Sequence, residues 1–125
     1  MRLKIVTIGV AGVVCSPARY ALAGLVQNVS GGVFPWGTFV VNIAGCFVFG
    51  LIWAITEKRL AFAAESRVYL LTGFVGAFTT FSTFAFETGA MARDGEYLLA
   101  AGNLAAHNVL GLVALFIGLA LGALI

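Results

Sequence analysis

The sequence predicts an all-α integral membrane protein with four transmembrane helices, the third of which is broken near its middle. Three observations lead to this fold class. The chain is 62% hydrophobic and only 10% charged, whereas soluble domains are about 45–50% apolar and about 25% charged. A spanning helix takes about 20 residues, so four of them with short connections account for all 125 residues as a single membrane domain. The third apolar run also contains an unusual density of residues that weaken a helix.

The first span is expected over residues 3–26, and Arg19 is the charge that lies well inside it. A charge at this depth is a functional candidate, but an arginine side chain can also extend to the membrane interface. The sequence leaves both interpretations open. Residues 27–34, which are polar and glycine-rich, are expected to form the first loop.

The second span is expected over residues 37–56, shortly after Pro35. Proline suits the first turn of a helix, where its missing N–H is not needed. Asn42 shares one helix face with Thr38 and Gly45, because they are spaced by three and four residues. An amide is costly in lipid unless it is hydrogen-bonded, so Asn42 is expected to face either a neighbouring helix or a cavity. Its N–H donors suit an anion as readily as a protein partner.

The third span, residues 68–92, is expected to break near residues 76–80. Glycines lie three positions apart at 73 and 76, and four hydroxyl residues follow within positions 79–83. Each glycine costs about 1 kcal/mol relative to alanine in a helix. Lipid cannot solvate the backbone groups that a break releases, so a break must face protein, water or an ion. The alternative is a Gly/Thr-rich packing face.

Three side chains of this span are candidates for a functional site. Phe81 and Phe84 are three residues apart, which places both rings on one face of the helix that resumes after the break. Glu87 follows one turn later and is the only carboxylate inside an expected span. The two phenylalanines also have a plain interpretation as core residues.

The fourth span is expected over residues 97–125, and its polar cluster consists of Asn103, His107 and Asn108. A lone histidine in a helix is more often a hydrogen-bonded packing residue than a ligand. No acidic residue lies near it in the sequence to suggest a proton relay.

The charges between the spans predict the orientation of the chain. Four spans place both termini and the second loop, residues 57–67, on one side of the membrane. Five basic residues lie on that side, namely Arg2, Lys4, Lys58, Arg59 and Arg67. The other side has Arg93, together with Arg19 if its side chain reaches that surface. The positive-inside rule therefore favours cytoplasmic termini.

The residue types exclude several classes of function. The sequence contains no activated nucleophile, no pair of carboxylates within reach of each other, no metal-ligand spacing and no phosphate-binding loop, so an enzyme is not expected. Its basic residues are scattered, which excludes nucleic acid as a partner. The spans instead contain neutral donors and phenyl rings, whose edges are positive. Such groups suit a small anion, whereas carbonyls released by the break suit a cation. One chain of this length cannot easily wall a pore, so a dimer is expected.

Four motifs closely resemble the Fluc (CrcB) family of fluoride channels, over nearly the whole chain. The most specific is an ordered string in the third span, GFVGAFTTFSTF, at residues 73–84. The other three are ARY at 18–20, PWGT at 35–38 and VNIAG at 41–45. The resemblance implies antiparallel, dual-topology homodimers of four-helix chains with two fluoride pathways. It also implies passive export of fluoride across the plasma membrane of a bacterium, with fluoride and membrane lipid as partners.

The resemblance implies roles for individual residues along the pathway. Phe81 and Phe84 would line fluoride sites with their ring edges. Asn42 would be the pore asparagine, and Ser82 and Thr83 would belong to a track of hydroxyl groups.

A second group of residues would lie beside the pathway or at the centre of the dimer. Arg19 matches an arginine near a vestibule, and Glu87 matches an acidic position after the second phenylalanine. His107 is a further vestibule or structural candidate. The backbone carbonyls of Gly76 and Thr79 would hold one structural sodium ion where two helix breaks meet.

The chain departs from the family pattern in two places. Pro17 occurs in the run before Arg19, where the family is usually glycine-rich. On the fourth span, the hydroxyl groups that the family often has there are replaced by Asn103, His107 and Asn108 or are absent, so this end of the track stays unassigned. The excess of basic residues on one side is also large for a dual-topology chain. An oppositely oriented paralogue is therefore an alternative partner.

Two other functions fit a four-helix membrane protein of this length. A small multidrug/proton antiporter needs a carboxylate inside the membrane, normally in the first helix, and the first span here has none. A non-transporting packing subunit would use its glycine faces to bind another membrane protein. The expected break argues against it, because interrupting a helix adds nothing to packing. Fluoride conduction is therefore the favoured hypothesis.

Overall fold

The computed structural model describes residues 1–58 and 64–125, which are helical apart from short connections and the chain ends. Among these described residues, four helical stretches are long and apolar enough to span a membrane, as the composition predicts. Three are continuous, namely α1 (Arg2–Ser30), α2 (Trp36–Lys58) and α6 (Tyr97–Leu124). The other, Ala64–Arg93, is divided into shorter pieces. Arg59, which we placed in the second loop, lies outside the described residues.

α1 is longer than the sequence predicts, because residues 27–30 are helical and do not belong to the first loop. The helix ends at Gly31, whose φ of 64° favours glycine over other residues. Gln27 organises the loop from within the helix. Its amide nitrogen donates to the carbonyl of Phe34 at 3.2 Å, and its oxygen accepts from the N–H of Gly37 at 3.1 Å. A polar residue at this position therefore ties the end of α1 to the start of α2.

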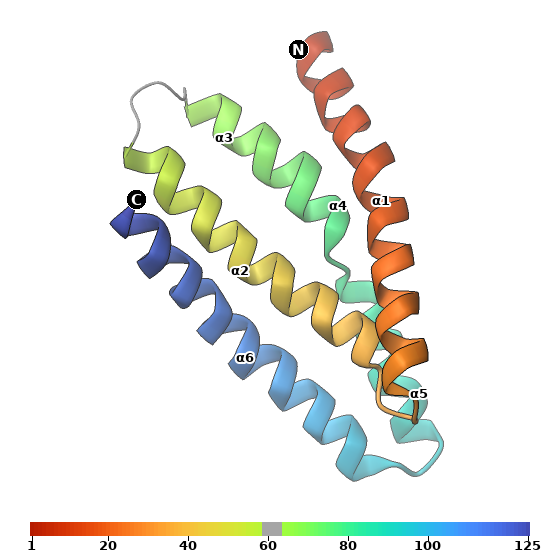
Figure 1. Cartoon of the computed structure of the whole chain (residues 1–125). Coiled ribbons are helices and arrows are strands. Elements are labelled where there is room, and N and C mark those ends of the chain that lie inside the picture. Colours follow the sequence, from red (N-terminus) through yellow and green to blue (C-terminus); the bar gives the residue numbers. More distant parts are fainter. Residues whose placement is uncertain (59–63) are drawn as a thin grey trace.

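α2 and α6 form the most extensive helix pair in the described chain and lie side by side along most of their length (Figure 1). Glycines allow this approach. A Cβ atom added at Gly50 would clash with the carbonyl oxygen of Leu115, and one added at Gly118 would clash with that of Phe47. Small residues of this kind bring backbones together in membranes, where packing drives helix association. The two glycines therefore determine how near α6 lies to α2.

The third span begins at Ala64, earlier than the expected residue 68. Glu65 and Arg67 are therefore helical, and the expectation that they belong to a solvated loop was wrong. Each of the two charged side chains contacts a residue of a neighbouring helix. Glu65 forms an ion pair with Lys4 of α1 at 2.7 Å, and the Arg67 guanidinium lies 4.2 Å from the centroid of the Trp53 ring. These contacts allow charged residues to remain in the first turns of a membrane helix.

Four helical pieces make up the third span. α3 (Ala64–Leu70) is followed by a π-helical turn, η1 (Leu71–Val75), and by one short turn of α-helix, α4 (Gly76–Phe78). Two non-helical residues come next, and α5 (Phe81–Arg93) completes the span. The expected break is therefore present, and it lies at residues 79 and 80.

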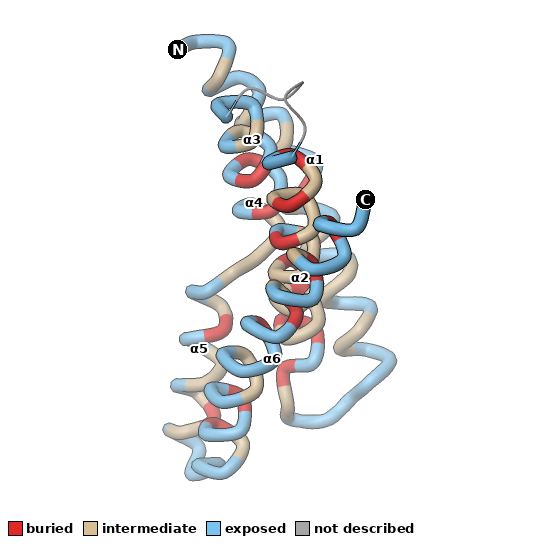
Figure 2. Tube along the Cα trace, turned by 90° about the vertical axis from the view of Figure 1, so that its left-hand side faces the viewer, coloured by how far each residue is buried: buried red, intermediate tan, exposed pale blue. Residues whose placement is uncertain are grey.

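Both halves of the third span contact α2, and the break lets each half also pack against a different helix. η1 and α4 contact α1, whereas α5 contacts α6. Figure 1 shows the chain crossing behind α1 and α2 between α4 and α5, about midway along the bundle. Both termini lie at one end of the bundle, with the end of α2 and the start of α3. Buried residues follow the inward faces of the helices, while most outward positions are exposed (Figure 2).

Candidate functional site

Thr79 and Thr80 are extended, and the side chain of Asn42 replaces hydrogen bonds that the helix loses there. The φ and ψ angles are −89° and 160° at Thr79, and −148° and 109° at Thr80. The Thr80 N–H donates to the Asn42 side-chain oxygen at 2.8 Å. The Asn42 amide nitrogen donates to the Thr80 carbonyl at 3.0 Å. Because unpaired backbone groups are costly in lipid, this pair of bonds stabilises the break. We call it the Asn42–Thr80 clamp.

The backbone carbonyls of residues 76–79 lose their helical partners at the break, and those of Gly76 and Thr79 are the first and last of the four. In a continuous helix, the Gly76 carbonyl accepts from the N–H of Thr80, four residues later. By the same rule, the Thr79 carbonyl accepts from the N–H of Thr83. Here the Thr80 N–H bonds to Asn42, and the Thr83 N–H bonds to the Thr80 hydroxyl at 3.3 Å. The Gly76 and Thr79 carbonyls are therefore available to another donor or to a cation.

The hydroxyl groups after the break begin α5. Thr80 is the N-cap residue, and its hydroxyl accepts from the Thr83 N–H while donating to the Thr83 hydroxyl at 2.9 Å. The hydroxyl of Ser82, an exposed residue, lies 3.5 Å from the Thr80 hydroxyl. Threonine is a favourable N-cap because its side chain satisfies a backbone donor of the first turn. The structure thus gathers Ser82 and Thr83 around Thr80.

Phe81 and Phe84 lie on one face of α5, as their spacing predicts, with ring centroids 5.5 Å apart. Their environments differ. Phe84 is 5% exposed, and its ring packs on the His107 imidazole with centroids 4.3 Å apart, whereas Phe81 is 77% exposed. Both rings line a cavity of about 230 Å³. The other residues around it are Asn42, Cys46, Thr79, Thr80, His107 and Asn108. We call this space the phenylalanine cavity.

Arg19, Thr83 and Glu87 line a second cavity of about 320 Å³, which Thr80 also borders. We call it the arginine cavity. The Thr38 hydroxyl donates to one Glu87 carboxyl oxygen at 2.8 Å. The other Glu87 oxygen and the Arg19 Nε are buried, and neither has a hydrogen-bond partner among the described residues. Arg19 and Glu87 thus line one cavity, and each has a buried polar atom without a hydrogen bond to the described residues.

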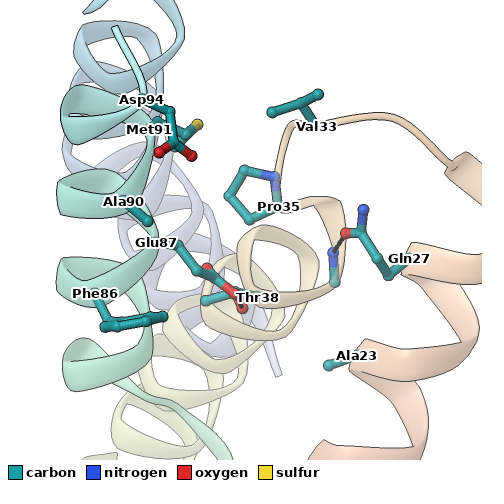
Figure 3. A pocket seen from close by; sticks show the side chains of 11 residues that line it. Ala23, Gln27, Val33, Pro35, Thr38, Phe86, Glu87, Ala90, Met91 and Asp94 are labelled. Atoms are coloured by element: carbon teal, nitrogen blue, oxygen red, sulfur yellow. Dashed lines mark hydrogen bonds between the residues drawn. The ribbon is translucent and has the colours of Figure 1, made fainter. Parts of the chain in front are cut away.

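Figure 3 shows a third cavity, of about 390 Å³, between the end of α1, the start of α2 and α5. Its lining includes Pro35 and Asp94, so it extends towards the loops at that end of the bundle. Glu87 points towards Thr38 across this space (Figure 3), and both residues also line the arginine cavity. The three cavities therefore share lining residues. Glu87 lines both the third and the second cavity, and Thr80 lines both the second and the phenylalanine cavity.

A family model described as CrcB-like protein, Camphor Resistance (CrcB), matches residues 6–119. The chain belongs to the CrcB-like family. The match runs from α1 to the last turns of α6, so it includes the helix break and all three cavities.

Named relatives of this CrcB-like chain match it over nearly its whole length. The protein from Nitrosococcus oceani is 55% identical, and that from Solidesulfovibrio magneticus is 54% identical, each over 122 residues and 98% of both chains. The protein from Desulforapulum autotrophicum is 48% identical over 125 residues and all of both chains. All three carry the name Fluoride-specific ion channel FluC.

In this CrcB-like chain, the residues proposed from sequence fall into two groups. The group around the phenylalanine cavity consists of Asn42, Thr79, Phe81, Phe84 and His107. The group around the arginine cavity consists of Arg19, Thr83 and Glu87. Two proposed residues belong to neither group, because Ser82 and Gly76 line neither of these two cavities.

Sequence reasoning gave no site role to Thr38 or Thr88, and it named Thr80 only as one of several hydroxyl donors near the break. Thr80 lines two cavities and completes the clamp with Asn42, and Thr38 donates a hydrogen bond to Glu87. Thr88 donates to the carbonyl of Phe84 at 2.8 Å. A signal for Thr88 exists in the spacing, because a threonine hydroxyl in a helix often bonds to the carbonyl four residues earlier.

Proposed function

We propose that the chain is a fluoride-selective, passive ion channel that exports fluoride from the cytoplasm and so reduces fluoride toxicity. The observation that carries this proposal is the helix break, where Asn42 holds an extended segment beside Phe81 and Phe84. A membrane protein retains such a break only where it contacts protein, water or an ion. The relatives' name, fluoride-specific ion channel, supports the same ion.

Fluoride would exchange its water for protein groups one contact at a time. The pathway residues would be Asn42, Phe81, Ser82, Thr83 and Phe84. One N–H of Asn42 bonds to the Thr80 carbonyl, and the second is left for the ion. The ring edges carry a partial positive charge. Because the pathway has few fixed charges, selectivity would come from size and dehydration, which favour the smallest halide.

The arginine cavity and the cavity of Figure 3 would form the vestibule. The Arg19 guanidinium would raise the local concentration of anions, because a charge in a cleft acts on ions through a medium of low dielectric constant. Glu87 would be kept to one side of the path by its hydrogen bond with Thr38. His107 would support the ring of Phe84, on which it packs.

The channel would be an antiparallel, dual-topology homodimer with two pathways, or a pair with an oppositely oriented paralogue. Phe81 is 77% exposed in the single chain. Within α1, which the structure describes in full, Cys15 is the only buried residue. An ion pathway cannot be left open to lipid, because lipid offers an ion no hydrogen bonds. A second chain would supply the missing wall.

A structural sodium ion would lie at the centre of this dimer, held by the carbonyls of Gly76 and Thr79 from both copies. Both carbonyls lose their helical donors at the break. Over residues 1–58 and 64–125, no group of three or more His, Cys, Asp or Glu side chains could hold a metal ion. Backbone oxygens at a broken helix suit sodium. The ion would fix the two breaks against each other.

Liposomes that contain only the purified chain test this proposal. The vesicles are loaded with potassium fluoride or potassium chloride, and a potassium ionophore starts the efflux. We expect fluoride to leave at least about 100-fold faster than chloride, a difference of about 2.7 kcal/mol in barrier height. No pH gradient should be needed. Liposomes without protein give the background rate.

Three results of this experiment would overturn the proposed function. Absence of fluoride efflux would show that the chain is not a fluoride channel. Equal efflux of the two halides would show that it does not select fluoride over chloride. Efflux that depends on an imposed pH gradient would point to a proton-coupled transporter.

A further inference from the structure

Phe84 is held at both its backbone and its ring by a closed circuit of contacts through α6. The Thr88 hydroxyl donates to the Phe84 carbonyl at 2.8 Å, and the Asn103 amide nitrogen donates to the Thr88 hydroxyl at 2.8 Å. The Asn103 backbone carbonyl accepts from Nδ1 of His107 at 3.1 Å. The His107 ring then packs on the ring of Phe84, with centroids 4.3 Å apart. The circuit thus ends on the residue where it began.

Asn103 forms the hydrogen bond by which this circuit passes from α5 to α6. It is completely buried, with an exposed fraction of 0%. The single hydrogen of the Thr88 hydroxyl is used on the Phe84 carbonyl, so the hydroxyl can only accept from α6. The Asn103 amide is the donor that meets this need. Because both partners are buried or half-buried, removing either one leaves a polar group without its bond.

The orientation of the His107 ring follows from the same reasoning. A carbonyl only accepts hydrogen bonds, so the contact with Asn103 requires the hydrogen on Nδ1. The imidazole is inclined at 41° to the Phe84 ring, and the Phe39 ring meets it at 85° with centroids 5.3 Å apart. His107 is thereby confined between two aromatic rings.

We propose that Asn103 is a positioning residue for Phe84 and acts on it through Thr88. This inference rests on the proposed function, in which the Phe84 ring contacts the ion. A phenyl ring attracts an anion at its edge and repels it at its face, so the direction of the ring determines the sign of its effect. Asn103 does not line the phenylalanine cavity. Its effect on the ion is exerted through the position of α5 and of the ring.

The variants Thr88→Val and Asn103→Leu remove the link while keeping the number and branching of the side-chain heavy atoms. In each, we expect the ratio of fluoride to chloride efflux to fall about tenfold. The double variant should lose no more than Thr88→Val, because that substitution already removes both hydrogen bonds of the Thr88 hydroxyl, including the one from Asn103. Thr88→Ser, which keeps the hydroxyl, should restore the ratio of the unmodified chain.

Thr56→Val is the matched control. Thr56 is a buried residue on α2 whose hydroxyl donates to the carbonyl of Ile52, four residues earlier, at 2.7 Å. Its other bond, to the Trp53 carbonyl at 3.2 Å, also lies within α2. It thus repeats the Thr88–Phe84 bond without a link to a second helix among the described residues. We expect this variant to keep the ratio of the unmodified chain.

A measurement of the orientation of the Phe84 ring tests the proposal even if a variant transports fluoride poorly. 4-Fluorophenylalanine is placed at position 84, and the protein in detergent is studied by ¹⁹F NMR. We expect one ¹⁹F resonance in the labelled chain without further substitution and in the labelled Thr56→Val variant. Thr88→Val and Asn103→Leu should show a shifted or divided resonance, because the ring loses its fixed direction.

An unchanged resonance, or an unchanged efflux ratio in both single variants, would overturn the positioning role and leave the channel intact. Losses that multiply in the double variant would also overturn it, since the two residues would then act separately. Absence of fluoride efflux from the unmodified chain would instead overturn the proposed function, and the ¹⁹F resonance would still report on the ring.

Discussion

Replacing Phe81 and Phe84 together with isoleucine is expected to lower fluoride efflux about 30-fold or more. Isoleucine keeps an apolar side chain but has no aromatic edge, so an ion in the phenylalanine cavity loses two positive contacts. At about 1 kcal/mol for each ring, the combined loss of about 2 kcal/mol corresponds to this factor. The measurement is the initial rate of fluoride efflux from liposomes with equal amounts of protein.

Phe116→Ile is the control for this substitution. Phe116 lies on α6 and is 64% exposed, so its loss should leave fluoride efflux unchanged. The two single variants should also differ from each other. Phe84→Ile removes a buried ring that packs on His107, so it should lower heat resistance more than Phe81→Ile. Undiminished efflux from the double variant would show that the rings do not contact the ion.

Asn42→Leu is expected to lower both fluoride efflux and the heat resistance of the protein. Leucine has the same number and branching of side-chain heavy atoms but cannot form the Asn42–Thr80 clamp, so the Thr80 N–H and carbonyl lose their partner. Each unpaired buried group costs about 1–3 kcal/mol, and the break loses the contact that keeps it extended. We expect efflux to fall at least about tenfold. Heat resistance is measured as the fraction of protein that elutes intact from a gel-filtration column after heating.

Asn28→Leu is the matched control, because Asn28 is exposed near the end of α1. It should leave both quantities unchanged. The two readouts also separate two roles of Asn42. A residue that only binds the ion would affect efflux and leave heat resistance unchanged. That result would contradict the clamp, although Asn42 would keep its place in the pathway.

The sequence predicts the four spans and the break because both depend on local properties. Apolar runs of the right length predict the helices, and the density of glycine and threonine at residues 73–83 predicts where the third helix fails. Helix ends were less accurate. Gln27 was assigned to a loop, but its amide bonds to the connection from inside α1. The charge of residues 57–67 also places Glu65 in a loop, and its helical position depends on a partner, Lys4, that is distant in the sequence.

The sequence predicts which residue types form the site, but it does not predict which residues bond to one another. Spacing indicates that Asn42 faces protein or a cavity, and the structure adds that its partner is the Thr80 backbone. No sequence pattern pairs Thr88 with Asn103, because that bond depends on how α5 packs against α6. Phe81 and Phe84 share a face as predicted, but their different burial depends on the position of α6.

The most direct test of fluoride passage at the ring edges beside the helix break is a contact measured between bound fluoride and phenylalanine. Solid-state NMR of frozen liposomes can detect dipolar coupling between ¹⁹F in fluoride and ¹³C in labelled rings. The chain has 11 phenylalanines, so the signal is compared with that of the Phe81→Ile/Phe84→Ile double variant. We predict coupling in the unmodified chain that disappears in the double variant. Liposomes that export fluoride yet show no coupling, or the same coupling in both proteins, would contradict this pathway.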